Sequence, residues 1–330
     1  MIRNFWYAIL QSKELKKNKM IGVTRLNEKL VLWRSDDNSI HCISDLCAHR
    51  GVSLSIGKLV HDNVQCPFHG LRYDGTGKVT LIPANGKSSK VPNHFKVHSY
   101  AAREEHGFVW IFWGDKTENL PDIPFFDNLD DSFHHSTRAD HWNTYYTRAI
   151  ENQLDEVHVP FVHHNTIGRG GKTLVHGPLL EIGDNELKFY PKYDIDVGQK
   201  PMKPEEFPKP GPGDFYVNFV FPNIWQNHIF DKLRIFTSFT PIDDENTLIY
   251  MRIYQKILRV PLLQNLVTYL NMKFSMVVLH QDRRVVITEK PKKTSLKMNE
   301  KLIPGDSPII AYRRIRDKLL KQNNKGYKYK

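Results

Sequence analysis

The chain has 330 residues, of which 40% are hydrophobic and 12% aromatic. This is ordinary for a globular protein with a real hydrophobic core, and the length predicts about two domains. Three cysteines are too few for a disulfide-stabilised secreted fold and fit a cytoplasmic location. The formal net charge is +11. Because no nucleic-acid-binding motif accompanies this charge, we expect solvated surface lysines and no nucleic-acid partner.

The N-terminal segment, MIRNFWYAILQSKELKKNKM, contains a short apolar run followed by lysines. A helix that spans a bilayer needs ~20 apolar residues, and this run is shorter. The segment also lacks the small-residue cleavage site of a secretory signal. We therefore expect no membrane span and no signal peptide.

The first part of the chain, from Phe5 to Gly114, has the pattern of short strands separated by Asn, Asp and Gly turns. The clearest strand segments are 21–35, 39–44, 77–82 and 97–114. Residues 115–131 are rich in Pro, Asp and Asn, which is typical of a linker. The sequence thus predicts an all-β domain over 1–116 and a second domain over 117–330.

The second domain mixes helices and strands. We expect a strand at 141–147, a helix at 148–159, a long helix from Pro261 to about Val286 and a final amphipathic helix at 308–322. Between these helices, strands are expected at 173–182, 187–195, 214–223, 233–242 and 247–258. This pattern predicts an antiparallel sheet packed on helices, and therefore an α+β fold.

Two segments of the second domain are expected to lack regular structure. Residues 201–214, PMKPEEFPKPGPGD, are too rich in Pro and Gly for a helix or strand. They form either a mobile loop over an active-site entrance or a variable surface loop. The basic tail, 321–330, is expected to be disordered.

Two mirrored pairs of metal-binding residues stand in the first domain: Cys47 with His49, and Cys66 with His69. A Rieske [2Fe–2S] centre needs this set, with two thiolates on one iron and two imidazoles on the other. A glycine follows each pair and permits a tight turn near a cluster. Zinc is the main alternative, but a Cys2His2 zinc finger pairs cysteine with cysteine and histidine with histidine.

The stretch CAHRG…CPFHGLRYDGTGKV resembles the Rieske domain of the Rieske non-haem iron oxygenases. Two departures, Ala48 and Leu71, do not affect a ligand. Respiratory and photosynthetic Rieske proteins carry an additional cysteine in each loop, where this chain has Val52 and Phe68. The remaining cysteine, Cys42, is expected to be a buried apolar residue near the cluster.

A second motif lies at residues 151–163, ENQLDEVHVPFVH, and matches the N-x-x-D-x-x-H-x-x-x-x-H of that family. Asn152, Asp155 and His158 are spaced by three and are expected to share one helical face. On a straight helix His163 would point away from His158. Pro160 is expected to end or kink the helix after His158, so that both imidazoles can reach one metal.

Two histidines and one carboxylate form the facial triad of non-haem Fe(II) oxygenases. We assign His158, His163 and Asp282 to this site, and we interpret His164 as a neighbour that does not bind the metal. The segment LHQDRRVVITEKP resembles the family's late helix, with Gln281 where glutamate is frequent. The alternative is that Asp282 is an exposed residue paired with a neighbouring arginine.

The resemblance also implies how electrons move. The family's counterpart of Asp155 hydrogen-bonds an iron-binding histidine of its own subunit and a Rieske histidine of the neighbouring subunit. A head-to-tail homotrimer is therefore implied. An NAD(P)H-dependent reductase, either directly or through a ferredoxin, would supply electrons, and a basic face could dock an acidic donor. Asn152 either holds the helix or lines the iron site.

The resemblance implies a helix-grip catalytic domain and a terminal oxygenase that uses O2. The short chain is similar to the vanillate and dicamba O-demethylases and to cyanobacterial toxin-tailoring hydroxylases, which favours monohydroxylation or demethylation over arene cis-dihydroxylation. The remaining alternatives are a Rieske electron-transfer protein without oxygenase chemistry and a non-enzymatic iron-binding regulator. Candidate pocket residues, which could equally be ordinary core, are Phe161, Phe219, Trp225 and His228.

Overall fold

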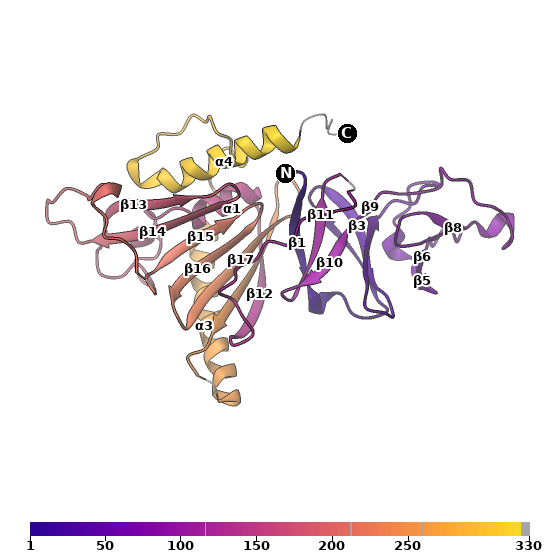
Figure 1. Cartoon of the computed structure of the whole chain (residues 1–330), viewed down its shortest axis with the longest axis horizontal. Coiled ribbons are helices and arrows are strands. Elements are labelled where there is room, and N and C mark those ends of the chain that lie inside the picture. The colour runs from indigo at the N-terminus through magenta and orange to yellow at the C-terminus, as the bar shows by residue number, and fades with distance from the viewer. Residues whose placement is uncertain (116, 212, 259, 325–330) are drawn as a thin grey trace. The chain divides into compact units, whose positions relative to one another are not determined.

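The computed structural model describes the whole chain except residues 116, 212, 259 and 325–330 (Figure 1). It divides into two compact units, one formed by 3–123 and the other by 1–2 together with 124–330. The last turn of helix α4 includes residues 321–323, so the disorder expected for the tail is wrong there. The rest of that prediction, residues 325–330, lies outside the described part of the chain.

The N-terminal unit consists of three antiparallel sheets, ordered β1-β11-β10, β2-β3-β4-β9 and β5-β6-β7-β8. The predicted all-β domain is therefore confirmed. Three short 3-10 turns connect its strands: Ser12–Glu14, Leu54–Ile56 and Pro83–Asn85. The strands are β1 (Phe5–Gln11), β2 (Met20–Arg25), β3 (Glu28–Arg34), β4 (Ile40–Ser44), β5 (Lys58–Val60), β6 (Asn63–Gln65), β7 (Arg72–Tyr73), β8 (Val79–Leu81), β9 (Ser99–Tyr100), β10 (Ala102–Glu105) and β11 (Phe108–Trp113).

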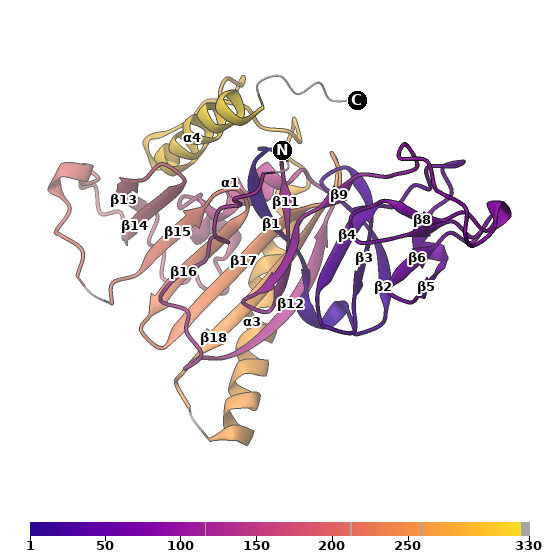
Figure 2. The ribbon, with the colours of Figure 1, turned by 45° about the vertical axis from the view of Figure 1, so that its right-hand side comes forward.

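The second unit is dominated by one antiparallel sheet, ordered β12-β18-β17-β16-β15-β14-β13 (Figures 1 and 2). Its strands are β12 (His134–Trp142), β13 (Leu174–Ile182), β14 (Glu186–Asp194), β15 (Tyr216–Val220), β16 (Ile224–Phe230), β17 (Leu233–Pro241) and β18 (Thr247–Gln255). The helices are α1 (Tyr146–Gln153), α2 (Val159–Val162), α3 (Pro261–Val286) and α4 (Ser307–Asn323), with 3-10 turns at Pro204–Glu206 and Pro304–Asp306. The fold is thus α+β, as predicted.

Helices α1, α3 and α4 pack on one face of this sheet. Trp225 of β16 donates its indole N–H to the carbonyl of Gln153, at the end of α1. The ring of Phe219 on β15 packs edge-on against Tyr312 of α4. On the opposite face, irregular chain before β12 packs on part of the sheet: Asn128 hydrogen-bonds Gln226, and the rings of Phe125 and Phe126 pack against Phe236. One face of the sheet therefore carries the helices that hold the candidate site.

The predicted elements agree best where the apolar pattern is long. Helix α3 begins at Pro261 and ends at Val286, and its bounds match the prediction. None of the helices in the described residues has both the length and the apolarity to cross a bilayer. The strand expected at 141–147 is wrong for most of its length, because β12 ends at Trp142 and α1 begins at Tyr146.

The helix expected at 148–159 is also wrong in its second half. Helix α1 ends at Gln153, and α2 begins only at Val159. Between them the Asp155 carboxylate accepts backbone N–H groups of Val157 and His158, which replaces the hydrogen bonds of a continuing helix. Side-chain capping thus ended the helix before Pro160 could do so.

A buried charge cluster holds α1 against α4. The guanidinium of Arg313 on α4 forms a bidentate pair with Glu151 of α1, at 2.9 and 2.6 Å. Arg148 of α1 lies 2.8 Å from Glu300 and 3.1 Å from Glu289. The side chains of Arg148, Glu151 and Arg313 are only 4–5% exposed. Because Glu151 precedes Asn152, this cluster fixes the helix that leads into the candidate site.

Replacing Arg313 by methionine should lower the free energy of unfolding of the second unit by about 3–5 kcal/mol, because it leaves buried carboxylates without their charge partner. The measurement is the shift of the urea unfolding curve followed by tryptophan fluorescence. Lys321 on the same helix is the matched control, since its ion pair with Asp317 is exposed. Lys321→Met should cost less than about 1 kcal/mol. Equal shifts for the two variants would contradict this account.

Candidate functional site

The two Rieske-type loops have the same backbone geometry. In each, the cysteine N–H donates to the carbonyl at the loop end, from Cys47 to Val52 and from Cys66 to Leu71, both at 2.8 Å. The glycine after each pair closes the loop by donating its N–H to the cysteine carbonyl, and both glycines have positive φ, 69° and 75°. Such a backbone favours glycine because it has no Cβ. The sequence expectation of tight turns at these glycines is confirmed.

The thiols and the imidazoles of these loops lie in different surroundings. Cys47 and Cys66 are buried in the hydrophobic core of this unit, whereas His49 and His69 are exposed. The two imidazole rings lie edge to face with centroids 4.7 Å apart. The donor set therefore fits a [2Fe–2S] cluster with buried thiolates and surface imidazoles. Cys42 is buried in β4, as expected, but outside the core cluster that contains these thiols.

Tyr73 of β7 contacts the first loop at two points. Its hydroxyl lies 3.1 Å from the sulfur of Cys47 and accepts the backbone N–H of Ala48 at 3.0 Å. Burial raises the pKa of the Cys66 thiol, and Cys47 beside it adds to the effect. Both thiols would bind iron as thiolates, because the positive metal stabilises the thiolate form.

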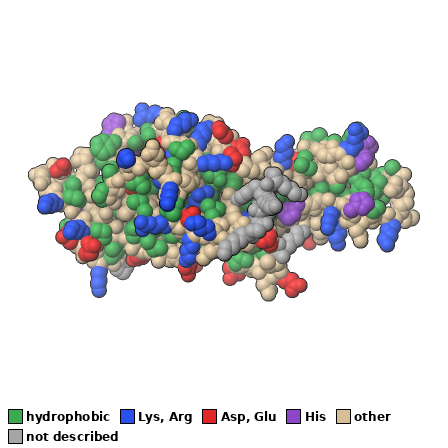
Figure 3. All heavy atoms as spheres, turned by 90° about the horizontal axis from the view of Figure 1, so that it is seen from above, with side chains coloured by type: hydrophobic (Ala, Val, Ile, Leu, Met, Phe, Trp, Pro, Cys, Tyr) green, Lys and Arg blue, Asp and Glu red, His purple; other side chains and the backbone are tan. Residues whose placement is uncertain are grey.

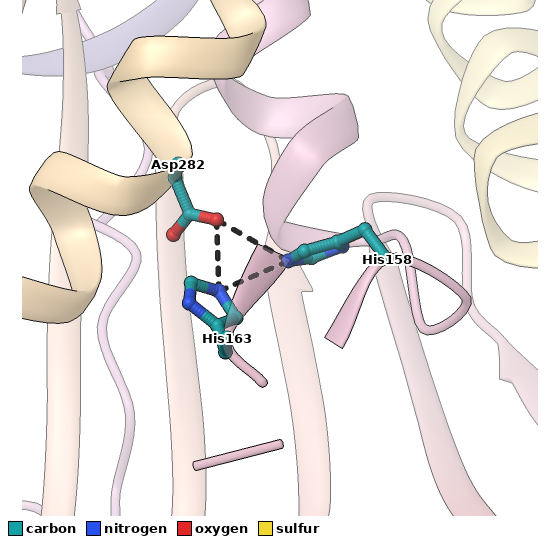
Figure 4. Close-up of side chains that lie close together, drawn as sticks. All are labelled: His158, His163 and Asp282. Carbon is teal, nitrogen blue, oxygen red and sulfur yellow. Dashed lines mark hydrogen bonds and ion pairs between the residues drawn. The ribbon is translucent and has the colours of Figure 1, made fainter. Parts of the chain in front are cut away.

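His158, His163 and Asp282 converge at one point of the second unit (Figure 4). Asp282 Oδ1 lies 3.2 Å from His158 Nε2 and 2.9 Å from His163 Nε2, and the two Nε2 atoms are 3.3 Å apart. The two histidines flank the single-turn helix α2, His158 before it and His163 after it. Asp282 comes from the last turns of α3. The structure thus brings together the three residues that the sequence assigned to a metal.

The three ligand atoms fit one metal ion. Two ligands at right angles, each about 2.1 Å from a metal, are separated by about 3.0 Å. The observed separations of 2.9–3.3 Å match this value, so the three atoms can occupy one face of a coordination sphere. A facial set of two histidines and one carboxylate is the arrangement typical of non-haem Fe(II) oxygenases.

Side-chain amides from α1 hold the Asp282 carboxylate. Asn152 donates to Oδ1 and Gln153 donates to Oδ2, both at 3.3 Å, and Gln153 also donates to Asn152 at 2.7 Å. The sequence left two roles open for Asn152, and the structure places it both in α1 and beside Asp282. The sequence motif does not identify Gln153 as a site residue. Its amide meets Asp282 at the point where α1 ends.

His163 is oriented by a partner on α3. Its Nδ1 lies 2.8 Å from Gln281 Oε1, which also accepts the hydroxyl of Thr166. From the sequence, Gln281 stands out only because the family frequently has glutamate at this position. An uncharged amide carbonyl here fixes the Nδ1–H tautomer and leaves Nε2 free for a metal. The neighbouring His164 is exposed, and its ring contacts the carbonyl of Phe161 instead.

Asp155 lies in the turn between α1 and α2. Its Oδ1 accepts the N–H of Val157 at 2.7 Å and that of His158 at 3.4 Å. Its Oδ2 lies 3.5 Å from His158 Nδ1. The side chain is 26% exposed, so part of the carboxylate remains accessible to solvent.

Without a metal, a proton on His158 balances the negative charge of the buried Asp282 carboxylate. Burial lowers the pKa of His158, but hydrogen bonds to Asp155 and Asp282 outweigh it and raise the pKa to about 10. Burial raises the pKa of Asp282, yet hydrogen bonds from His158 and His163 lower it to about 2. A cation, whether proton or metal, is therefore required to balance the buried carboxylate.

The triad lies in the wall of a cavity of about 730 Å³ between the sheet and helices α1 and α3. Of the four predicted pocket residues, only Trp225 lines this cavity. Phe161 is exposed on α2, Phe219 packs against α4, and His228 is stacked on Tyr216 on the opposite face of the sheet. None of the described residues within 201–214 lines it, so a gating role for that loop stays a prediction.

Glu156 is a cavity residue that the sequence did not single out. It is buried, and its carboxylate accepts the hydroxyl of Tyr193 on β14. Burial raises its pKa to about 8. From the sequence alone, this glutamate of the metal motif would be interpreted as a solvated charge. It faces the cavity because the helix breaks after Gln153.

Comparison with known protein families gives one match in each of the two units. The model of the Rieske [2Fe-2S] domain matches residues 5–101, and that of the vanillate O-demethylase oxygenase C-terminal domain matches residues 142–322. The second match alone covers more than half of the chain.

Relatives of known activity include methylxanthine N3-demethylase NdmB of Pseudomonas putida, 26% identical over 95% of this chain and 88% of its own. Chlorophyllide a oxygenase of Chlamydomonas reinhardtii is 34% identical over 51% of this chain. This chain spans only 26% of that chloroplast protein, and 30% of protein TIC 55 of Arabidopsis thaliana.

Solved structures share the fold. Pseudomonas putida NdmA superposes with a TM-score of 0.76 at 22% identity, covering 96% of this chain and 90% of that one. Dicamba monooxygenase bound to dicamba gives 0.70 at 21% identity, covering 98% of both. A Rieske [2Fe–2S] cluster and a mononuclear iron are the two metal centres of such proteins. From its two matched domains, this chain belongs to the Rieske non-haem iron oxygenases with a vanillate O-demethylase oxygenase C-terminal domain.

Proposed function

We propose that this protein is a terminal oxygenase that takes electrons from a separate reductase and uses O2 to hydroxylate or demethylate a small organic substrate. The observation that carries this proposal is the convergence of His158, His163 and Asp282 in the wall of a cavity of about 730 Å³. A cavity of this size suits a small-molecule substrate. A pure electron-transfer protein would need neither the cavity nor the triad.

His158, His163 and Asp282 are the residues that would hold the mononuclear iron. Iron bound there supplies the binding and activation of O2. The protein contributes the surroundings: Asn152 and Gln153 fix the Asp282 carboxylate, and the apolar sheet floor excludes water from the substrate. These contacts would keep the three ligand atoms in place while a substrate enters the cavity beside them.

Cys47, His49, Cys66 and His69 are the residues that would hold the Rieske cluster. We propose that electrons leave through the exposed imidazoles of His49 or His69 and cross to the Asp155 carboxylate of a neighbouring subunit. A head-to-tail homotrimer is the assembly that this route requires. The partly exposed Asp155, already beside His158, is suited to such a bridge.

The electron donor is expected to be an NAD(P)H-dependent reductase, acting directly or through a ferredoxin. One segment of this chain is 33% identical over 112 residues to oxidoreductase NdmD of Pseudomonas putida, a match that covers 34% of this chain and 19% of that protein. The net charge of +11 favours an acidic donor, although Lys and Arg side chains are scattered over the face shown in Figure 3. With Cys47 and Cys66 assigned to the cluster, Cys42 is left without a cysteine to pair with, which favours a reducing, cytoplasmic compartment. We expect neither a membrane nor a nucleic acid as partner.

We favour one-atom oxygenation, as hydroxylation or demethylation, over cis-dihydroxylation. A relative that matches 95% of this chain is a methylxanthine N3-demethylase, and a structural neighbour is dicamba monooxygenase. Demethylation and monooxygenation are the activities that these two names give, and neither is cis-dihydroxylation. The cavity lining is mostly apolar, which suits such a substrate.

Asp282→Asn should weaken mononuclear iron binding while leaving the Rieske cluster intact. An amide cannot balance the charge that a carboxylate balances, so we expect at least about a tenfold weaker iron affinity. Fe(II) bound at the triad is measured by the paramagnetic resonance signal of its nitric oxide adduct. The visible spectrum of the cluster is recorded on the same samples.

His164→Ala is the matched control, because His164 lies beside the motif but points to a backbone carbonyl. It should retain both the nitric oxide signal and the cluster spectrum. A full nitric oxide signal in the Asp282 variant would disprove the ligand assignment, and with it the proposed function.

Iron binding should become tighter as pH rises. In the metal-free protein the pKa of His158 is raised to about 10, so this imidazole carries a proton at neutral pH. A metal must displace that proton, so the affinity should rise about tenfold per pH unit below the pKa. Anaerobic calorimetry in buffers of different ionisation enthalpy should show about one proton released per Fe(II). An affinity that does not change between about pH 6.5 and about pH 8.5 would contradict this prediction.

A further inference from the structure

Helix α3 presents three different faces along its length. The face that packs against the rest of the unit is fully buried and consists of Thr268, Met272, Leu279 and Val286, each 1% exposed. The face that lines the cavity consists of Asn271, Ser275, Val278 and Asp282. The third face points outward, and it is the unusual one because it is apolar.

The outward face is a row of large apolar side chains, which we call the α3 stripe: Leu263, Leu266, Leu270, Phe274 and Val277. These five residues are 48–54% exposed. The loop before the helix extends the stripe with Ile257, Leu258 and Val260, which are 36–55% exposed. A large contiguous apolar patch on the surface of a folded protein marks an interaction site.

The stripe lies where another molecule can reach it. The N-terminal turns of α3 extend past the ends of the strands of the large sheet (Figures 1 and 2). At the other end of the stripe, Phe274 is half exposed and also lines the cavity. A partner on the stripe would therefore lie along the outer side of the same helix whose inner side forms a cavity wall.

The spacing of the stripe predicts that this partner is a helix. From Leu263 to Val277 its members follow one another at intervals of three, four, four and three residues. Such intervals place them in one narrow row, and this is the pattern of a seam between two packed helices. A second copy of α3 carries the same row and is its natural complement.

The charge of the helix favours a second copy over other partners. Lys273 is the only Lys, Arg, Asp or Glu between 261 and 281, and its Nζ lies 4.9 Å from the ring centre of Tyr269. A helix that lies on a membrane surface has a polar face rich in Lys and Arg, which α3 lacks. An acidic electron donor would likewise require several cations. A nearly uncharged stripe is compatible with itself, because self-pairing brings few like charges together.

The size of the stripe is sufficient for a specific contact. Its eight apolar residues, at about half exposure, present on the order of 600 Å² per copy, so a pair would bury about 1,200 Å². Specific and stable protein interfaces begin at about this size.

We propose that two copies of this chain pair through their α3 stripes about a two-fold axis. This contact is separate from the proposed head-to-tail trimer contact, which involves Asp155 and the Rieske imidazoles. A two-fold contact added to a closed ring of three gives a closed assembly of six chains.

The test is the number of chains per particle, measured by analytical ultracentrifugation of the anaerobic holoenzyme. We expect six chains for the unaltered protein and three for the double variant Leu266→Glu/Leu270→Glu. Pairing would bury four carboxylates without partners, so self-association should weaken at least about a hundredfold. Both leucines are about half exposed and glutamate is a good helix former, so the fold should be retained. The visible spectrum of the cluster checks this, and the uncharged Leu266→Gln/Leu270→Gln is a second variant that should also yield trimers.

The matched control is Leu296→Glu/Leu302→Glu. These two leucines are 39% and 42% exposed and lie outside the stripe. This variant should remain an assembly of six chains. Six chains in both α3 variants, or three in the control, would overturn the role of the stripe.

The pairing and the trimer fail in different ways. Three chains in the unaltered protein would overturn the α3 pair and leave the trimer standing. Two chains in the unaltered protein and one in the α3 variants would support the pair and contradict the trimer. A single chain would overturn both. If the unaltered protein does not pair but binds vesicles of phosphatidylcholine and phosphatidylglycerol, and the α3 variants do not, the stripe binds lipid and the proposal is wrong.

Discussion

The Asp282 carboxylate meets His158 and His163 at 3.2 and 2.9 Å, and the catalytic unit is arranged to keep these atoms together. The two histidines flank α2, whereas Asp282 comes from α3 far along the chain, so both segments must be held in place. The buried Arg313–Glu151 pair fixes α1, the Asp155 carboxylate fixes the turn before α2, and packing on the sheet fixes α3. Loss of any of these supports would spread the ligand atoms and weaken the metal site.

Sequence alone predicted the two domains' fold class, most strands and the long helix, because their apolar periodicity is strong and extends over many residues. It also identified the three residues that converge: His158 and His163 from a fixed motif spacing, and Asp282 from the resemblance of its segment to the family's late helix. The break after Gln153 was not predictable, because a side-chain cap and a continuing helix compete for the same backbone N–H groups. The strand β16 was missed as a separate element, since polar residues interrupt its alternation.

The same limit explains the site residues that the sequence did not reveal. Gln153 and Glu156 turn inward only because the helix ends where it does. Such roles depend on tertiary geometry, which single-sequence patterns do not contain. Two of the predicted pocket aromatics, Phe161 and Phe219, failed for this reason.

The central claim is that one chain carries both a Rieske cluster and a separate iron. Its most direct test is the content of iron and acid-labile sulfide in anaerobically purified protein, before and after incubation with Fe(II). The account predicts about three irons for every two sulfides, because the cluster holds two of each and the triad holds one more iron. About two irons for every two sulfides, even after Fe(II) is supplied, would contradict it and leave an electron carrier.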